Sequence, residues 1–285
     1  MQPNYLPYAD ISLLPRYEWQ QINDVFHELQ SAYEIEFDFP QGGCQQRAQI
    51  MSMLLQKKFT IAHAKIWLFA PAALYLNDDR MLFASDKKCL SEGNMFEWSY
   101  HVAPIVRVQL NDDIHSMVID PSINKDAPMY LLDWFAAIGN STTGQYSFLW
   151  PDKYFFNSSY LTNNRNEVTM IFDGTFFDFE NPAKDNLIVE KGLAIHDMVK
   201  EIYQSYILPL IHNNNPEDAA MLSDMKAIFG NATALDMLFS QNISAYTNNT
   251  SQRYVQTQYN QIFMEAKNIF NTRLAHWTHF INTLL

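Results

Sequence analysis

One stretch of the sequence constrains the fold more than any other. In residues 98–110 an apolar side chain stands at every second position, and a second apolar stretch, residues 114–119, follows closely. The alternating set is Trp98, Tyr100, Val102, Pro104, Val106, Val108 and Leu110. A period of two is typical of a β-strand, and Asn111-Asp112-Asp113 has the chemistry of a tight turn. The pattern therefore predicts an antiparallel hairpin.

Helices are predicted before this hairpin. In residues 15–33 apolar side chains recur every three or four positions, which indicates a helix. Pro40-Gln41-Gly42-Gly43 then breaks the chain, and residues 44–58 form a second helical segment. A strand over residues 64–69 and a short helix over residues 129–138 complete the pattern. Helices that pack on an antiparallel sheet make an α+β fold.

The composition changes beyond Gly139. Residues 140–182 are polar and aromatic and have hairpin character, notably in residues 168–172 and 176–179. Four helices are expected after them, over residues 187–211, 216–229, 232–246 and 250–283. We therefore expect one domain over residues 1–182 and an α-helical C-terminal module over residues 183–285.

Composition and charge narrow the possible functions. The chain has 285 residues, of which 48% are hydrophobic, so it can bury a large core. A net charge of −12 argues against nucleic acid as a partner, because phosphate binding needs a basic surface. The chain lacks the glycine-rich loops of nucleotide-binding proteins, and His276 and His279 alone do not make a zinc site. We expect neither a cofactor nor a metal.

Cys44 is the first candidate functional residue. It follows Gly42-Gly43 and begins a predicted helix. The unpaired N–H groups at a helix N-terminus favour a thiolate, and the glycines let a substrate approach the thiol. The alternative is a buried, inert cysteine. The second cysteine, Cys89, has neither a preceding glycine nor a following helix, and two cysteines make no disulfide framework.

His101 and Asp120 are the other candidates, because the hairpin brings them together. A two-residue turn at Asn111-Asp112 places residue 101 opposite residue 122 and diagonal to residue 120. Diagonal neighbours on paired strands are within reach of long side chains, so the Asp120 carboxylate can orient the His101 imidazole. His101 is expected on the strand face opposite Trp98, Tyr100 and Val102. The alternatives are a core histidine and an aspartate that ends a strand.

These segments resemble a known family. Cys44-x-x-Arg47-Ala48 at a helix start, Tyr100-His101-Val102-Ala103-Pro104 on a strand, and Ile119-Asp120-Pro121-Ser122 with Trp134 beyond it are similar to the motifs of the protein glutaminases. The resemblance covers about residues 40–138. It implies a papain-like core, in which the helix that carries the cysteine packs on a sheet that carries the histidine and the aspartate.

The resemblance also implies the chemistry. Cys44 would be the nucleophile, His101 the general base and acid, and Asp120 the orienting carboxylate of a deamidase that hydrolyses glutamine side chains in a protein substrate. A cysteine protease, a ubiquitin-family peptidase and a transglutaminase share this triad and remain alternatives. A non-catalytic protein-binding module that uses the C-terminal helices is a further alternative.

Two features depart from the family. Residues 76–96 form a longer connection than the domain needs, which we interpret as a loop near the cleft that sets substrate choice. The helical C-terminal module has no recognised counterpart, and Met1-Gln2-Pro3-Asn4-Tyr5 does not resemble a signal peptide. The sequence has no run of 18 apolar residues. We therefore expect a soluble protein without a membrane span, either cytoplasmic or delivered into a host cell as a bacterial effector that acts on a host protein.

Overall fold

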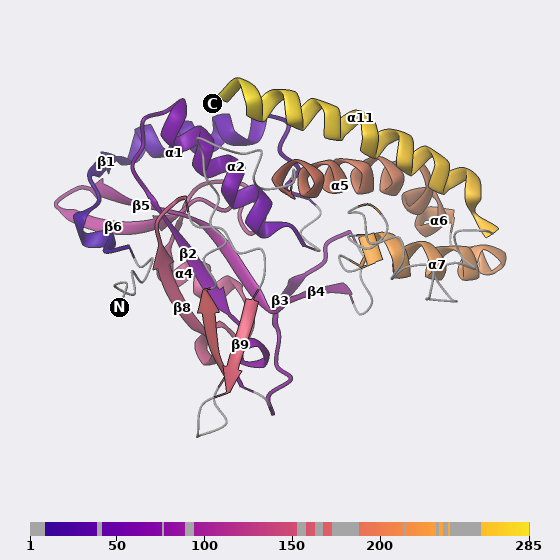
Figure 1. Cartoon of the computed structure of the whole chain (residues 1–285), viewed down its shortest axis with the longest axis horizontal. Helices are drawn as coiled ribbons and strands as arrows, with labels where there is room; N and C mark the ends of the chain where they lie inside the picture. The colour runs from indigo at the N-terminus through magenta and orange to yellow at the C-terminus, as the bar shows by residue number, and fades with distance from the viewer. Residues whose placement is uncertain are drawn as a thin grey trace.

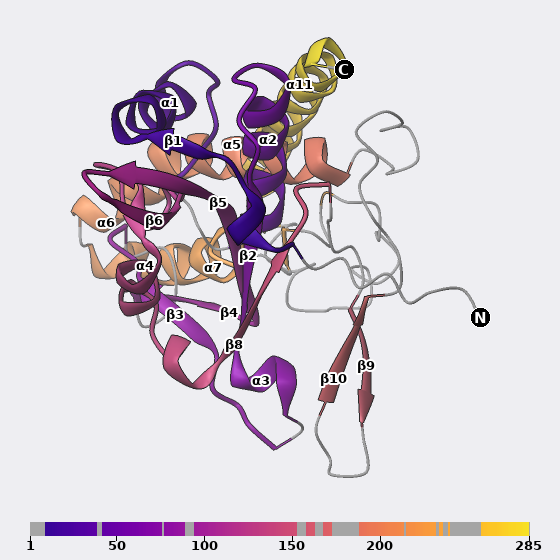
Figure 2. The same ribbon diagram turned by 90° about the vertical axis from the view of Figure 1, so that its left-hand side faces the viewer.

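The computed structural model describes most of the chain. The described residues are 9–38, 42–75, 77–88, 94–152, 158–162, 168–172, 188–213, 215–231, 234–235, 239 and 258–284. Side chains are described for all of these except residues 158–162, 168–172 and 188. Figures 1 and 2 show a sheet with helices α1 and α2 on one side and a group of C-terminal helices beyond α2.

The predicted hairpin is the centre of the sheet. β5 (Tyr100–Leu110) pairs antiparallel with β6 (Asp113–Val118), and Leu110 lies opposite Asp113. The turn is therefore Asn111-Asp112, as predicted. Asn111 has a φ of 55°, which asparagine tolerates better than most residues.

Further strands extend the sheet in the order β7-β6-β5-β2-β8. Their bounds are Met129–Tyr130 for β7, Ala64–Phe69 for β2 and Gln145–Leu149 for β8. The strand predicted over residues 64–69 is thus confirmed. All pairs along this order are antiparallel, and the short β1 (Arg16–Glu18) adds one parallel pair at the far end of β5.

The strand predicted over residues 98–110 is wrong at its start. The chain bends at Ser99, and β4 (Met95–Trp98) pairs with β3 (Leu82–Ser85) in a separate two-stranded sheet. The bend ends the alternation, so Trp98 does not lie on the face opposite His101. Its indole stacks on the imidazole with ring centroids 4.9 Å apart.

The connection between β2 and β5 is not a plain loop. α3 (Pro71–Leu74) follows β2, and β3, which lies within residues 76–96, pairs with β4, which begins there at Met95 and ends at Trp98. Gly139 pairs with Phe83, and a Cβ at Gly139 would collide with the Phe83 ring, so the backbones lie in close contact there. The β3–β4 pair is therefore fixed to the segment that follows α4.

Three helices of the first half are close to their predicted positions: α1 (Trp19–Ser31), α2 (Cys44–Lys57) and α4 (Leu131–Ala137). α1 begins later than predicted because residues 16–18 pair with β5 as β1. α2 is buried along nearly its whole length and packs on β5. The helix that carries Cys44 therefore lies directly on the strand that carries His101.

The C-terminal half is helical where it is described. α5 (Ile188–Ile202) continues through a π-helical turn (Tyr203–Ile207) into α6 (Leu208–Asn213), and a short turn (Pro216–Asp218) leads to α7 (Ala219–Phe229). The long α11 (Asn260–Leu284) runs along α5 (Figure 1). The helix expected over residues 232–246 lies mostly outside the described residues.

One apolar cluster joins α1, α2 and β5 to α5, α7 and α11. α2 is the shared layer, since it contacts β5 on one side and α5 on another. The predicted α+β class, with an antiparallel sheet and C-terminal helices, is confirmed. The division into domains at residues 182 and 183 stays a prediction.

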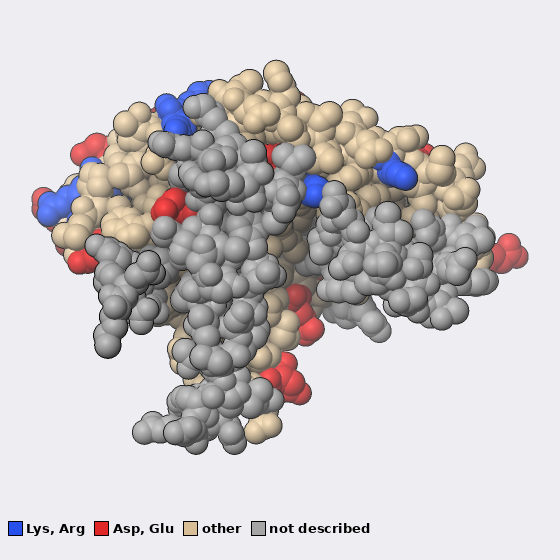
Figure 3. All heavy atoms as spheres, viewed as in Figure 1, with Lys and Arg blue, Asp and Glu red and all other residues tan. Residues whose placement is uncertain are grey.

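The remaining expectations concern residues 140–182 and the surface. Residues 168–172 form a strand as expected, β10 (Val168–Phe172), but its partner is β9 (Ser158–Thr162), and residues 176–179 lie outside the described part of the chain. Among the described residues, no helix is long and apolar enough to cross a membrane. On the face shown in Figure 3, acidic and basic side chains are interspersed.

Candidate active site

Cys44 is the first residue of α2. Gly43 precedes it as N-cap, with a φ of 71° that favours glycine and with no side chain to cap the helix. The first N–H groups of a helix have no partner within it, so this end of α2 is electropositive. Cys44 is 4% exposed, and its Sγ lies 3.9 Å from the carbonyl oxygen of Tyr100. The thiol thus lies against the start of β5.

His101 follows Tyr100 on β5 and is 1% exposed. Its ring is stacked between two indoles, with centroids 4.9 Å from Trp98 and 5.7 Å from Trp134. These contacts fix the plane of the imidazole. Nε2 is hydrogen-bonded to Oδ2 of Asp120 at 2.8 Å, so Nδ1 is the nitrogen left for other chemistry.

Asp120 lies two residues after β6 and is 3% exposed. Its Oδ2 also accepts a hydrogen bond from the indole N–H of Trp134, at 2.8 Å. Its Oδ1 accepts from the hydroxyl of Ser122 at 2.5 Å and from the Ser122 backbone N–H at 3.2 Å. Both oxygens of this buried carboxylate are therefore satisfied within the protein.

The pKa values of the pair favour its charged form. Burial lowers the pKa of His101, but the Asp120 carboxylate and the nearby Cys44 thiol raise it, and the result is a value of about 9. Burial raises the pKa of Asp120, but His101, Ser122 and Trp134 lower it below its usual value. At neutral pH the imidazole is therefore protonated and the carboxylate is ionised.

The predicted hairpin register explains this contact. The β5–β6 ladder ends where Ile105 faces Val118, and one further hydrogen bond joins the N–H of Ile119 to the carbonyl of Pro104. The chain then turns at Pro121, and Asp120 reaches His101 along the diagonal. The structure brings Cys44, His101 and Asp120 together as the sequence indicated.

Sequence reasoning missed other residues of the site. Trp134 and Ser122 stood in the family motifs, but their hydrogen bonds to Asp120 were not foreseen. Arg47 is 2% exposed, and its Nη1 lies 2.9 Å from Nδ1 of His196 on α5. No local sequence pattern predicts a contact between two residues that lie 149 positions apart.

The structure adds little on a possible metal site or on Cys89. Among the described residues there is no group of three or more histidine, cysteine, aspartate or glutamate side chains that could hold a metal ion. His276 and His279 lie on α11, and Nε2 of His276 lies 4.0 Å from Oε2 of Glu34. Cys89 lies outside the described residues.

A comparison with protein families finds a match over part of the chain. A family model described as Glutaminase matches residues 22–138, which run from α1 to the residue after α4. We call this range, which is less than half of the chain, the glutaminase segment, and over it the chain is similar to the protein glutaminases. The glutaminase segment contains all three candidate residues together with Arg47 and Trp134, whereas α5 and α11 lie outside it.

Solved protein-glutaminases also match. The NMR structure of protein-glutaminase from Chryseobacterium proteolyticum is 18% identical, with a TM-score of 0.42 over 64% of this chain and 86% of that chain. A crystal structure of protein-glutaminase is 19% identical, with a TM-score of 0.40 over 61% and 83% of the two chains. A mutant of pro-protein-glutaminase is 19% identical, with a TM-score of 0.43 over 68% and 62%. Comparison with curated proteins finds no match.

Proposed function

We propose that this protein is a cysteine-dependent deamidase that hydrolyses glutamine side chains in a protein substrate. One observation carries the proposal. Within the glutaminase segment, Nε2 of the buried His101 lies 2.8 Å from Oδ2 of Asp120, and this pair lies beside the Cys44 thiol at the start of α2. A thiol, an imidazole and an orienting carboxylate are the groups that nucleophilic attack on an amide requires.

In the first half of the reaction Cys44 forms a thioester. The Cys44 thiolate attacks the carboxamide carbon, and the N-terminus of α2 offers backbone N–H groups to the oxyanion. Imidazolium His101 then gives its proton to the leaving nitrogen, so that ammonia departs and the acyl-enzyme remains. Asp120 holds the ring through Nε2, which leaves Nδ1 to carry the transferred proton.

In the second half water releases the product. Neutral His101 takes a proton from water, and the hydroxide attacks the thioester carbon. The C–S bond breaks, so the glutamate product is released and the Cys44 thiolate is regenerated. The stacking of His101 between Trp98 and Trp134 keeps the ring in one orientation through both halves of the reaction.

We further propose that α2 packed on β5 forms a papain-like core, and that the substrate is a host protein.

Each alternative activity would give an outcome that differs from deamidation. A protease with the same triad would cleave the backbone, and a transglutaminase would let an amine replace water at the thioester. A binding protein would leave its partner chemically unchanged.

The test compares the wild-type protein with Cys44→Ala. A set of glutamine-rich proteins is incubated with each, and released ammonia and the intact mass of the substrate are measured. The proposal predicts that ammonia is released in proportion to the mass that the substrate gains when –NH2 is exchanged for –OH. Both signals should be lost in Cys44→Ala. Fragments of the substrate, amine-linked products, or ammonia release that survives in Cys44→Ala would each contradict it. Cys44→Ser, which keeps the size of the side chain, serves as a second control.

A further inference from the structure

A buried cation lies on the same helix turn as Cys44. Arg47 is three residues further along α2, so the two side chains share one face, and Arg47 is 2% exposed. Burial lowers the pKa of Arg47, whereas Cys44, Asp120 and Glu36 raise it. Arginine stays protonated in proteins, so the guanidinium adds a positive charge behind the thiol.

His196 of α5 binds this guanidinium. Arg47 Nη1 lies 2.9 Å from His196 Nδ1, and because arginine only donates, Nδ1 accepts and the neutral ring carries its proton on Nε2. The second terminal nitrogen, Nη2, is buried without a hydrogen-bond partner in the described part of the chain. A buried charge with so few partners depends strongly on each of them.

The surface of α5 is shaped to the first turn of α2. A Cβ built on Gly43 would lie 2.1 Å from Nε2 of His196, so the imidazole rests directly on the backbone before Cys44. A Cβ on Gly192 would lie 2.4 Å from Cγ of Gln46. Gly192 and His196 are four residues apart and therefore share one face of α5.

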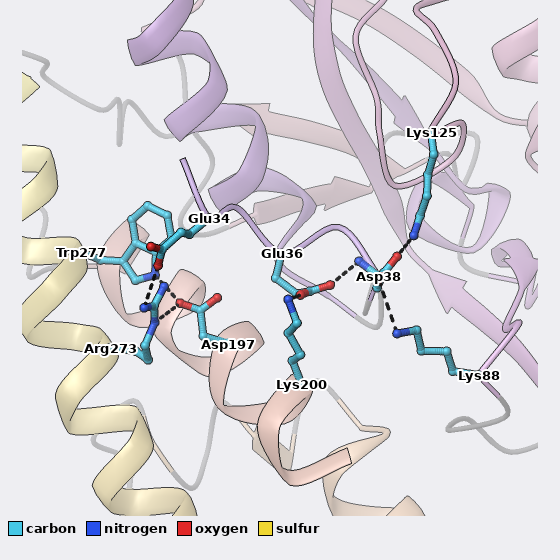
Figure 4. Close-up of polar contacts among 9 residues, drawn as sticks. All are labelled: Glu34, Glu36, Asp38, Lys88, Lys125, Asp197, Lys200, Arg273 and Trp277. Atoms are coloured by element: carbon cyan, nitrogen blue, oxygen red, sulfur yellow. Dashed lines mark hydrogen bonds and ion pairs between the residues drawn. The ribbon is translucent and has the colours of Figure 1, made fainter. Parts of the chain in front are cut away.

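Ion pairs hold the segment that leads into α2 against the same helices. Glu36, which is buried, pairs with Lys200 of α5 at 2.7 Å, and Glu34 pairs with Arg273 of α11 at 3.0 Å. Figure 4 shows these contacts side by side, with Arg273 also bound to Asp197 of α5 at 2.6 Å. The C-terminal helices thus contact both the approach to Cys44 and the turn that contains it.

We propose that His196 is a positioning residue that holds the Arg47 guanidinium behind Cys44, so that the C-terminal helices complete the active site. The inference rests on the proposed role of Cys44 as the nucleophile. Arg47 favours the thiolate through its charge, and His196, which lies outside the glutaminase segment, keeps that charge in place. Among the described residues, the charged or titratable groups that act on this turn include His101, Asp120 and Glu36.

The test follows the thiolate directly. The rate of Cys44 alkylation by iodoacetamide is measured against pH, with peptide mass spectrometry to separate Cys44 from Cys89. The variants are Arg47→Met, Arg47→Lys, His196→Leu and His196→Asn, and circular dichroism checks that each is folded. Lys57→Met is the matched control, because Lys57 is an exposed cation ten residues beyond Arg47 on α2, about 15 Å from it along the helix.

Loss of the held charge makes the thiolate less favourable. Arg47→Met and His196→Leu should therefore move the midpoint of the alkylation profile to higher pH by about one unit, which is about a tenfold lower rate below the midpoint. His196→Asn keeps an acceptor near the position of Nδ1 and should restore most of the wild-type profile. Lys57→Met should leave the profile unchanged. If Arg47→Met does not fold, Arg47→Lys and the His196 variants decide.

A wild-type midpoint in folded His196→Leu, or an equal shift in Lys57→Met, would overturn the proposal. A failure of His196→Asn to restore the profile would do so as well. The alkylation readout requires no deamidase activity, so it distinguishes this proposal from the proposed function. Absence of ammonia release with a shifted profile would count against the deamidase alone.

Discussion

Trp134 donates its indole N–H to Oδ2 of Asp120 over 2.8 Å, the same oxygen that binds Nε2 of His101. The indole ring also stacks on the imidazole, with centroids 5.7 Å apart. One side chain from α4 therefore fixes both members of the pair. Hydrogen bonds to an ionised group are stronger than those between neutral groups, so this contact holds the carboxylate firmly.

The first prediction concerns that contact. Trp134→Phe keeps an aromatic ring but removes the donor to Asp120, and loss of a hydrogen bond to a charged group costs about 1.5–3 kcal/mol. We expect kcat for ammonia release to fall about tenfold or more. Steady-state kinetics measure this. Trp150→Phe is the control, since Trp150 is 37% exposed; equal losses in both variants would mean that the contact does not matter.

Asp120→Asn tests the role of the carboxylate. The amide has nearly the same shape, but it carries no charge and can present its –NH2 group to His101. We expect kcat to fall by a factor on the order of a thousand or more, as for other triads. The pKa of His101 should also fall, because the main influence that raises it against burial is removed. Kinetics and a histidine titration by NMR measure the two effects. A variant with near wild-type kcat would show that Asp120 does not orient the base.

The raised pKa of His101 predicts a pH-dependent stability. The folded-state pKa is about 9, against 6.5 for an unperturbed histidine, so the protonated ring stabilises the folded protein below pH 6.5. This contribution is lost as pH rises through 9. It amounts to about 3 kcal/mol, from 1.36 kcal/mol per pKa unit.

Urea unfolding between pH 6 and pH 9.5 measures that loss. His101→Gln should lack this part of the pH dependence, whereas His279→Gln, which changes an exposed histidine of α11, should keep it. A wild-type pH dependence in His101→Gln would disprove the ion pair.

Gly43 and His196 are predicted to be energetically coupled. Gly43→Ala puts a Cβ 2.1 Å from Nε2 of His196 and strains a backbone with a φ of 71°, so the free energy of unfolding should fall by more than about 1 kcal/mol. Adding His196→Ala removes the steric clash but not the strain. Urea unfolding of the two single variants and the double variant should therefore give non-additive losses. Additive losses would mean that the ring and the glycine do not touch in solution.

The hairpin could be predicted from sequence because its signals are local. The alternation in residues 100–110 sets the strand, and Asn111-Asp112 sets the register, which together bring Asp120 within reach of His101. The bend at Ser99 could not be predicted, because Trp98 continues the same alternation. A period of two cannot reveal that a chain has passed from one sheet to another.

The support around the site could not be predicted for a different reason. The contact of Arg47 with His196 depends on how α5 packs on α2. Local sequence patterns do not determine how two helices so far apart in sequence pack on each other. The available signal was weak: Gly192 and His196 lie four residues apart on a helix, opposite a glycine that precedes Cys44. Such a pattern becomes meaningful only after the packing is known.

The most direct test of the proposed chemistry follows one oxygen atom. A protein substrate is incubated with the enzyme in heavy-oxygen water, and its peptides are mapped by tandem mass spectrometry. The account predicts that glutamine becomes glutamate with one solvent oxygen in its side-chain carboxyl, an intact backbone, and no conversion by Cys44→Ala. Solvent oxygen at a new C-terminal carboxyl, or labelled glutamate formed equally by Cys44→Ala, would contradict it.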